Sequence, residues 1–266
     1  SSTMNDLIDN FHKKGSLEDW KKIFDLYNRP GSEAQALALL FAFGATLMPF
    51  TNTKGIICHL TSSESGTGKT TVQLFINSVW GDPNVTLIHG DTKLSKVHVI
   101  GVMNNLPVTL DEITDIKKEE ASQFAYLITQ GRTRLRMSSD SNKLREHTLT
   151  WNTVLITSGN SSIFDIISSK SKSADGELNR IFELRIKSGS SESAKDSRYD
   201  NINNHYGHAG PIFAQHIVKN KDEISKRVTT MIDKVAKSFG IVGRERFLAD
   251  GYAAAFVGGE VAKELG

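Results

Sequence analysis

Ser63-Glu64-Ser65-Gly66-Thr67-Gly68-Lys69-Thr70 is the stretch that decides the fold of this chain. It follows a short apolar run, Ile56 to Leu60, and precedes residues 71–80, whose apolar side chains recur at helical spacing. A buried strand, a glycine-containing loop and a helix are therefore predicted in that order. This context indicates a phosphate-binding loop, because the loop amides and the N-terminus of the helix converge on one point.

The residues of this loop have separate predicted roles. Gly66 and Gly68 allow the backbone to curl so that successive N–H groups point inward. Lys69 is predicted to reach the β- and γ-phosphates of ATP, and the Thr70 hydroxyl to take one position on Mg²⁺. The predicted ATP contacts are Ser65, Gly66, Thr67, Gly68, Lys69, Thr70 and Thr71.

Ser63 stands where such loops commonly have their first glycine. That position shapes the approach to the loop and makes no charge contact, so we expect serine to be accommodated there. The alternative is a serine- and glycine-rich turn before an ordinary helix.

Composition limits the classes of function. The 266 residues can bury one large domain, with or without a helical extension. Lys and Arg (32) nearly balance Asp and Glu (30), so nucleic-acid binding would need a local basic patch. The single cysteine, Cys58, excludes an internal disulfide and a cysteine-rich zinc site and fits the reducing cytoplasm. The polar first ten residues predict no signal peptide, and the 15-residue apolar run from Ala36 to Phe50 predicts a buried helix and no membrane association.

The order of elements predicts an α/β fold with a mainly parallel five-stranded sheet covered on both faces. After the first strand, further strands are expected at 84–88, 106–110, 151–157 and 181–186. We expect N-terminal helices in 1–50, an ATPase core in 51–187, a flexible connector in 188–204 and C-terminal helices in 205–266. Ser32 with Gln35 is predicted to form a capping box at the start of the long apolar helix.

Two acidic residues, Asp111 and Glu112, end the third predicted strand about forty residues after Lys69. In nucleotide hydrolases a strand end of this kind places one carboxylate near Mg²⁺ and the next against the attacking water. Asp111 is therefore the predicted metal-side residue and Glu112 the predicted general base. By itself the pair also fits an ordinary helix cap.

A basic hairpin is predicted at 131–150, around the polar tip Ser138 to Asn142. Cations alternate with uncharged residues on both strands, which places the cations on one face. Such a face can hold the phosphates of a single strand without reading its sequence. A solvated face without a ligand is the alternative. The candidate DNA contacts are Arg132, Arg134, Arg136, Lys143 and Arg145.

Taken together, SSESGTGKT, VTLDE, ITSGN and ELNRIFEL follow in the order of AAA+ ATPases. The chain resembles, more closely, the superfamily 3-like replicative helicase domains of phages and plasmids and their primase-helicase relatives. The segments Gly131 to Arg136 and His205 to Gly210 look like that family too. The resemblance covers roughly residues 32–266.

This resemblance implies an ATP-dependent DNA helicase that acts as a hexameric ring on single-stranded DNA, with a primase or polymerase module in the full-length protein. Asn160 matches the sensor that contacts the γ-phosphate or its water, and Arg180 matches the arginine finger that reaches the neighbouring subunit. Arg185 is the second choice for the finger. The alternative for Asn160 is an asparagine in a turn after a strand, and the alternative for Arg180 is a salt-bridged arginine before a strand.

Two other functions remain open. A switch ATPase would use the same site to control assembly of a nucleic-acid or defence complex, without translocation and without the hairpin. A small-molecule kinase would share the phosphate loop and the strand order, but the Asp111–Glu112 pair suits hydrolysis by water better. His205 and His208 lack nearby carboxylate or cysteine partners, so we expect them to serve structure rather than metal binding.

Overall fold

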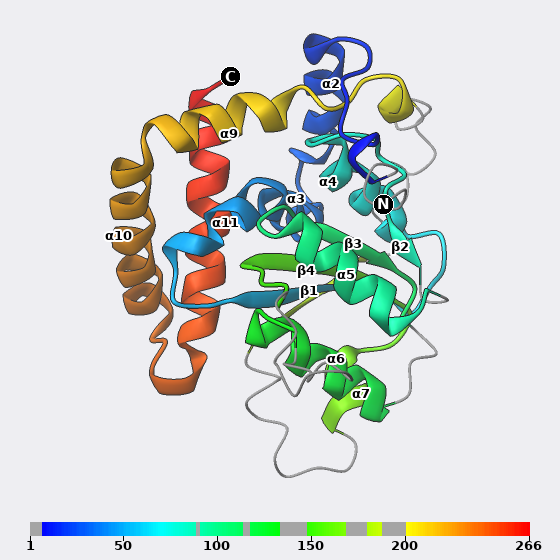
Figure 1. The fold of residues 1–266 in the computed structure, drawn as a ribbon, viewed down its shortest axis with the longest axis vertical. Helices are drawn as coiled ribbons and strands as arrows, with labels where there is room; N and C mark the ends of the chain where they lie inside the picture. The colour runs from blue at the N-terminus through cyan, green and yellow to red at the C-terminus, as the bar shows by residue number, and fades with distance from the viewer. Residues whose placement is uncertain (1–6, 89–90, 114–117, 134–147, 169–179, 188–200) are drawn as a thin grey trace, which may run out of the picture.

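The computed structural model describes residues 7–88, 91–113, 118–133, 148–168, 180–187 and 201–266 (Figure 1). The strands are β1 Gly55–Thr61, β2 Leu87–Ile88, β3 Val108–Asp111, β4 Thr153–Gly159 and β5 Ile181–Arg185. The α-helices are α2 Leu17–Phe24, α3 Glu33–Gly44, α4 Lys69–Ser78, α5 Lys93–Met103, α6 Lys118–Gln130, α7 Ile163–Ser168, α9 Ala209–Lys219, α10 Lys221–Phe239 and α11 Arg246–Glu264. Short 3-10 segments are η1 Asp25–Tyr27, η2 Ala45–Phe50 and η5 Gly243–Glu245.

The strands form one parallel sheet in the order β2-β3-β4-β1-β5, which confirms the predicted α/β class. Strand β2 has only two residues, so the strand predicted at 84–88 is far shorter than expected and four longer strands make up the body of the sheet. The central strands β1 and β4 pair along seven residues, from Gly55 with Thr153 to Thr61 with Gly159. Because all strands run the same way, their carboxyl ends share the edge from which the phosphate loop leaves β1.

Alternate residues of β1 enter two separate cores. Ile56, Cys58 and Leu60 pack with α2, α3, α4 and α11 on one face of the sheet. Ile57 packs on the other face with residues of α5, α6 and α7. This is the period of two that a strand buried on both faces requires. Cys58 is a core residue, and burial raises the pKa of its thiol.

The apolar N-terminal segment behaves as a core helix. Within the described residues, Glu33–Phe50 is the one segment long and apolar enough to cross a membrane, and 56% of it is buried in the fold. It packs against α11, α4 and the sheet as α3 and η2. The predicted capping box is wrong: Ser32 has ψ near 20°, outside the extended region of an N-cap, and its hydroxyl accepts no helix amide. It contacts Arg29 Nε at 3.4 Å instead.

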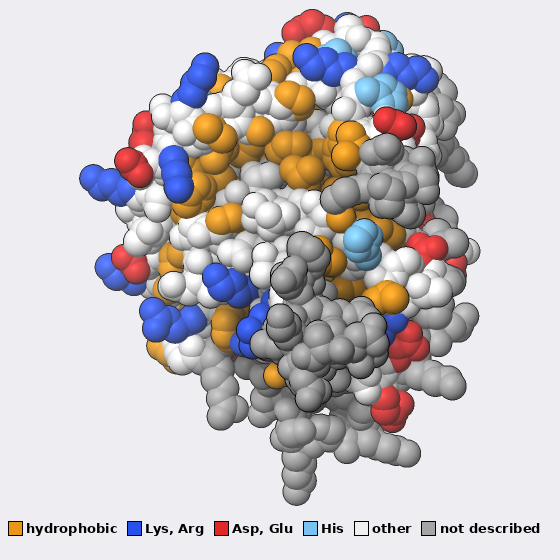
Figure 2. Space-filling model, viewed as in Figure 1, with side chains coloured by type: hydrophobic (Ala, Val, Ile, Leu, Met, Phe, Trp, Pro, Cys, Tyr) orange, Lys and Arg blue, Asp and Glu red, His pale blue; other side chains and the backbone are white. Residues whose placement is uncertain are grey.

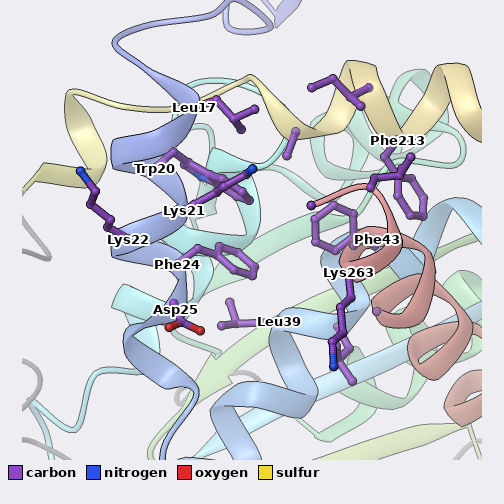
Figure 3. Close-up of a pocket in the computed structure, with 17 residues that line it drawn as sticks. Leu17, Trp20, Lys21, Lys22, Phe24, Asp25, Leu39, Phe43, Phe213 and Lys263 are labelled. Carbon is purple, nitrogen blue, oxygen red and sulfur yellow. The ribbon is translucent and has the colours of Figure 1, made fainter.

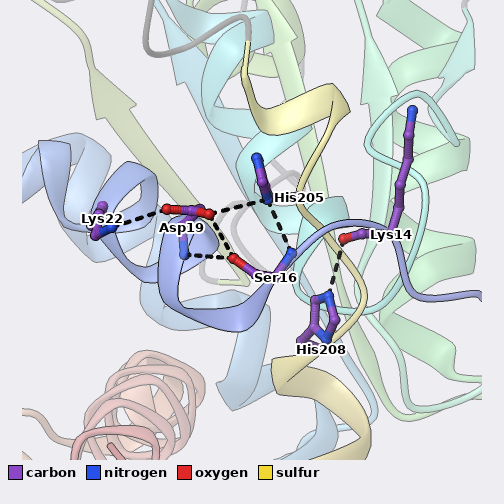
Figure 4. Close-up of polar contacts among 6 residues, drawn as sticks. All are labelled: Lys14, Ser16, Asp19, Lys22, His205 and His208. Atoms are coloured by element: carbon purple, nitrogen blue, oxygen red, sulfur yellow. Dashed lines mark hydrogen bonds and ion pairs between the residues drawn. The ribbon is translucent and has the colours of Figure 1, made fainter.

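The residues before α2 are held by the segment that leads into α9 (Figure 4). Lys14 and Tyr206 form an antiparallel bridge. The Ser16 N–H donates to His205 Nδ1 at 3.0 Å, so this nitrogen carries no proton and its 3.9 Å approach to Asp19 is not an ion pair. His208 Nε2 donates to the Lys14 carbonyl at 3.0 Å. Both histidines thus form hydrogen bonds that join the two segments. Among the described residues, no group of three or more His, Cys, Asp and Glu side chains could hold a metal ion.

Candidate nucleotide site

The predicted phosphate loop joins β1 to α4. Gly66 and Gly68 have φ of 72° and 88°, in the region where a side chain would be strained, and Gly68 directly precedes the first helical residue, Lys69. Among the described residues other than glycine, positive φ occurs only at Asn104 and Glu112. Ser63 therefore needs no glycine-like conformation, which agrees with the expectation that serine is accommodated.

Lys69 is almost fully buried at the start of α4. Its Nζ donates to the carbonyl of Glu64 at 3.1 Å and to Oδ1 of Asn160 at 3.0 Å. Burial lowers the pKa of Lys69, while the carboxylates of Asp111 and Glu112 oppose that effect. The lysine thus presents a cation at the loop, held by neutral acceptors that phosphate oxygens can replace.

Thr70 lies beside Asp111, as the sequence predicts. The Thr70 hydroxyl is 3.4 Å from both carboxylate oxygens of Asp111. A hydroxyl next to a carboxylate, both open to solvent at the end of a strand, fits Mg²⁺, which prefers oxygen ligands and keeps several waters. These two residues are the ones that fit the ion.

Ser158 is a site residue that sequence reasoning missed. Its hydroxyl donates to Asp111 Oδ1 and accepts the N–H of Glu112 at 3.0 Å, so it links β4 to the end of β3. Its signal in the sequence is its place in the segment Ile156 to Asn160, two residues before the predicted sensor Asn160.

Glu112 has a strained backbone. Its φ is 49°, which is uncommon for a residue with a long side chain, and its N–H donates to Asp111 Oδ1 at 3.1 Å. The next amide, of Ile113, donates to the Ser158 carbonyl at 2.9 Å. These bonds hold the turn that brings the exposed Glu112 carboxylate to the edge of the sheet beside the phosphate loop. Strain of this kind is often found at functional sites.

Gln73 is a second residue that the sequence did not single out. Its Nε2 donates to the carbonyls of Leu110 at 3.1 Å and Ile156 at 3.3 Å. This fully buried side chain therefore ties α4 to β3 and β4 one turn after the phosphate loop. A polar residue at an inward position of an apolar helix was the available signal.

The two candidate finger residues lie at opposite ends of strand β5: Arg180 directly precedes the strand and Arg185 is its last residue. The carbonyl of Arg180 accepts the N–H of Ile57 at 3.1 Å, whereas Arg185 pairs in register with Thr61. The five residues from Ile57 to Thr61 span about 13 Å along a strand. Arg180 is therefore distant from the phosphate loop of its own chain, and Arg185 lies at the edge that carries the loop.

Arg180 is also engaged within its own chain. Its guanidinium lies 4.2 Å from the centre of the Phe247 ring, and Nη1 donates to the Thr129 carbonyl at 3.5 Å. Nε is buried with no hydrogen-bond partner among the described residues, and burial lowers the pKa of Arg180.

Only the base of the predicted basic hairpin is described. Arg132 and Thr150 form an antiparallel bridge, and the N–H of Thr133 donates to the Leu149 carbonyl at 2.9 Å. The Arg132 side chain is exposed. The remaining candidate DNA contacts, Arg134, Arg136, Lys143 and Arg145, lie outside the described residues.

A large apolar cavity lies away from the phosphate loop. It has a volume of about 540 Å³ and opens between α2, α3, α9 and α11, with Trp20, Phe24, Phe43 and Phe213 in its wall (Figure 3). On the face of the molecule that Figure 2 shows, apolar side chains are visible across the upper half. Few polar groups converge on the cavity, so the phosphate loop is the better candidate for a site that performs chemistry.

Three comparisons place the chain among known proteins. No curated protein matches it significantly. A solved structure described as "SCCmec type IV Cch - active helicase" superposes with a TM-score of 0.73 at 18% identity, over 96% of this chain and 48% of that one. The chain thus spans about half the length of that helicase, and the likeness shows a shared fold. A structure described as "The X-ray structure of JCV Helicase" matches at a TM-score of 0.31 and 11% identity, over 84% of this chain and 71% of that one.

The family comparison covers the N-terminal part of the chain, including the phosphate loop and the end of β3. Residues 2–148 match the model described as "Domain of unknown function (DUF927)". As this match extends over more than half of the 266 residues, the chain belongs to the DUF927 family of domains of unknown function.

Proposed function

We propose that this chain is the ATP-hydrolysing core of a ring-forming helicase that moves along single-stranded DNA during replication of a phage or plasmid. The observation that carries the proposal is the convergence of Lys69, Asn160, Thr70 and Asp111 at the carboxyl edge of the sheet. The ends of two parallel strands, β3 and β4, and the N-terminus of α4 supply these groups, which is the arrangement that phosphoryl transfer to water requires. The fold shared with a helicase structure supports the same assignment.

In this proposal the loop amides and Lys69 bind the β- and γ-phosphates of ATP. Thr70 and Asp111 hold Mg²⁺, which supplies positive charge next to the phosphate oxygens. Glu112 accepts the proton of the attacking water, and Asn160 orients that water or the γ-phosphate. The positive φ of Glu112 fixes where its carboxylate leaves the strand.

Arg180 is proposed to act on the ATP of an adjacent copy. Its place at the far edge of the sheet supports a role in trans, since it cannot serve its own phosphate loop. Delivery of the guanidinium to a neighbour requires it to leave Phe247 and Thr129, so assembly and Arg180 release would be coupled. A hexameric ring and a primase or polymerase module elsewhere in the protein complete the proposal.

The basic hairpin is proposed to contact the DNA strand inside the ring. Arg132, at its base, is exposed and free to face a phosphate backbone. Replacing Arg132, Arg134 and Arg136 by alanine should abolish the stimulation of ATP turnover by single-stranded DNA and leave turnover without DNA unchanged. The control is Lys226→Ala, which removes an exposed cation from α10. Equal stimulation of the triple variant and the wild type would contradict a DNA-driven motor.

A switch ATPase that does not translocate is the second candidate. The engagement of Arg180 with Phe247 and Thr129 favours it, because a finger already bound within its own subunit suits a protein that changes state on assembly. Under this alternative ATP turnover rises with protein concentration and is indifferent to DNA.

A further inference from the structure

A row of polar side chains crosses the sheet face that packs on α6 and α7. Thr157 of β4, His59 of β1 and Glu183 of β5 pair in register across three adjacent strands. Two residues earlier along the same three strands, the corresponding row is apolar and consists of Leu155, Ile57 and Ile181. Residues paired in this way lie on one face of a sheet, so the polar row sits just inside the carboxyl edge.

His59 is fully buried and uses both ring nitrogens. Nε2 is 3.0 Å from the carbonyl oxygen of Ser161, and Nδ1 is 2.9 Å from the hydroxyl of Thr157. A carbonyl only accepts, so Nε2 carries the proton and the Thr157 hydroxyl donates to Nδ1. Burial lowers the pKa of His59, which agrees with a neutral ring held in this one tautomer.

Glu183 binds the same loop from the next strand. One of its carboxylate oxygens accepts the Ser162 hydroxyl at 2.9 Å and the N–H of Ile163 at 2.8 Å. Ile163 is the first residue of α7, so the carboxylate satisfies a free amide at the start of that helix.

Asn160 lies between these anchors and the phosphate loop. It follows β4 directly, its side chain is exposed, and its Oδ1 accepts from Lys69 Nζ at 3.0 Å. The next three residues, Ser161, Ser162 and Ile163, are the ones that His59 and Glu183 bind. The position of Asn160 therefore depends on two side chains that do not reach the phosphate loop themselves.

We infer that His59 and Glu183 are positioning residues that fix the loop between β4 and α7 and thereby hold Asn160 against Lys69 for ATP turnover. The inference rests on the proposed function for its effect on rate. Polar groups are costly to bury unless they are fully bonded. His59 is fully buried and Glu183 is half-buried, and each of them bonds to the segment Ser161 to Ile163 that follows Asn160.

The rate test compares three replacements on β1. His59→Leu removes both hydrogen bonds and should lower kcat for ATP on the order of 10- to 100-fold, with little change in KM, because a small misplacement of a contacting group has that effect. His59→Gln retains an amide donor for Ser161 and should recover most of the loss. Cys58→Ala, a control on the opposite face of the same strand, should leave kcat near the wild-type value.

A double-variant cycle separates positioning from general destabilisation. If His59 acts through Asn160, His59→Leu should cause no further loss of kcat in an Asn160→Ala background. The same fold loss in both backgrounds would overturn the inference.

Hydrogen exchange tests the positioning without ATP. The amides of Ile163 and Phe164 should exchange at least ~10-fold faster in Glu183→Ala and His59→Leu than in wild type or Cys58→Ala. Thr157→Val, which removes only the hydroxyl donor to Nδ1, is the milder variant if His59→Leu does not fold. Unchanged exchange in the folded variants would overturn the inference. If the variants show faster exchange as expected but the wild-type protein does not turn over ATP, only the proposed function would be contradicted.

Discussion

The Nζ atom of Lys69 lies 3.0 Å from Oδ1 of Asn160, 91 residues further along the chain. The two residues follow adjacent parallel strands: Lys69 comes after β1 through the phosphate loop, and Asn160 comes directly after β4. The contact joins the predicted phosphate-binding cation to the predicted sensor. In the proposed function, phosphate oxygens of ATP would replace this contact.

Replacing Lys69 with alanine should weaken ATP binding by about 10- to 150-fold. This range corresponds to the loss of a charged hydrogen bond, about 1.5–3 kcal/mol. Lys96→Ala is the matched control, because burial also lowers the pKa of Lys96 but α5 lies away from the loop. Titration with a fluorescent ATP analogue in the presence of Mg²⁺ measures both. Equal affinities of the two variants would contradict the role of Lys69.

Arg180→Ala should abolish ATP turnover while leaving ATP affinity unchanged. Loss of the guanidinium above Phe247 should also reduce the free energy of unfolding by about 0.5–2 kcal/mol. Arg185→Ala is the comparison, since that exposed residue lies beside the phosphate loop of its own chain. ATP turnover and ATP affinity are measured for both variants. Weakened ATP binding by Arg180→Ala would exclude a role confined to the neighbouring subunit.

Gly258→Ala should destabilise the fold by about 1–3 kcal/mol, the usual cost of overpacking. A methyl group there would lie 2.7 Å from the backbone nitrogen of Gly44, where α11 crosses α3. Gly259→Ala is the control, because its methyl group would meet only the end of the flexible Leu40 side chain. Denaturant unfolding measures both variants, and equal stabilities would show that the crossing can widen without cost.

The unfolding free energy should decrease in mild acid partly because of His59. Its folded-state pKa lies below the ordinary value of 6.5, so the unfolded chain takes up the proton first as the pH falls. The contribution is complete above pH ~6.5 and is lost as the pH falls towards the folded-state pKa, at up to about 1.4 kcal/mol per pH unit.

The variant His59→Gln should therefore lose less unfolding free energy between about pH 7.5 and 5.5 than the wild type does. His98→Gln removes an exposed histidine of α5 and should retain the wild-type slope. Denaturant titrations at each pH provide the measurement. A His59→Gln slope identical to the wild type would contradict a lowered pKa of the buried His59 ring.

The sequence predicted the elements whose cause is local. The phosphate loop, its glycines and the strand before it follow from one short pattern. The helices α9, α10 and α11 lie within the range 205–266 that was predicted to be helical, because their apolar spacing and the breaks between them lie within that range. Ser16 caps α2 in the same local way, accepting the N–H of Asp19.

Features that depend on contacts between distant segments were not predictable in the same way. Ser158 and Glu183 gain their importance from strand register, which fixes their neighbours on β3 and β1. The capping box at Ser32 failed because the backbone before α3 takes a different conformation and directs the hydroxyl elsewhere. Only the sheet topology shows that Arg180 and Arg185 lie at opposite ends of β5 relative to the phosphate loop.

ATP hydrolysis by wild type and Glu112→Gln, with and without single-stranded DNA, tests the central claim most directly. The proposal predicts wild-type turnover that rises with protein concentration and with DNA, and at least ~100-fold less in Glu112→Gln at undiminished ATP affinity, since general-base catalysis contributes 10²–10⁴-fold. Turnover that persists in Glu112→Gln, or wild-type protein that binds ATP without hydrolysing it under any of these conditions, would contradict the account.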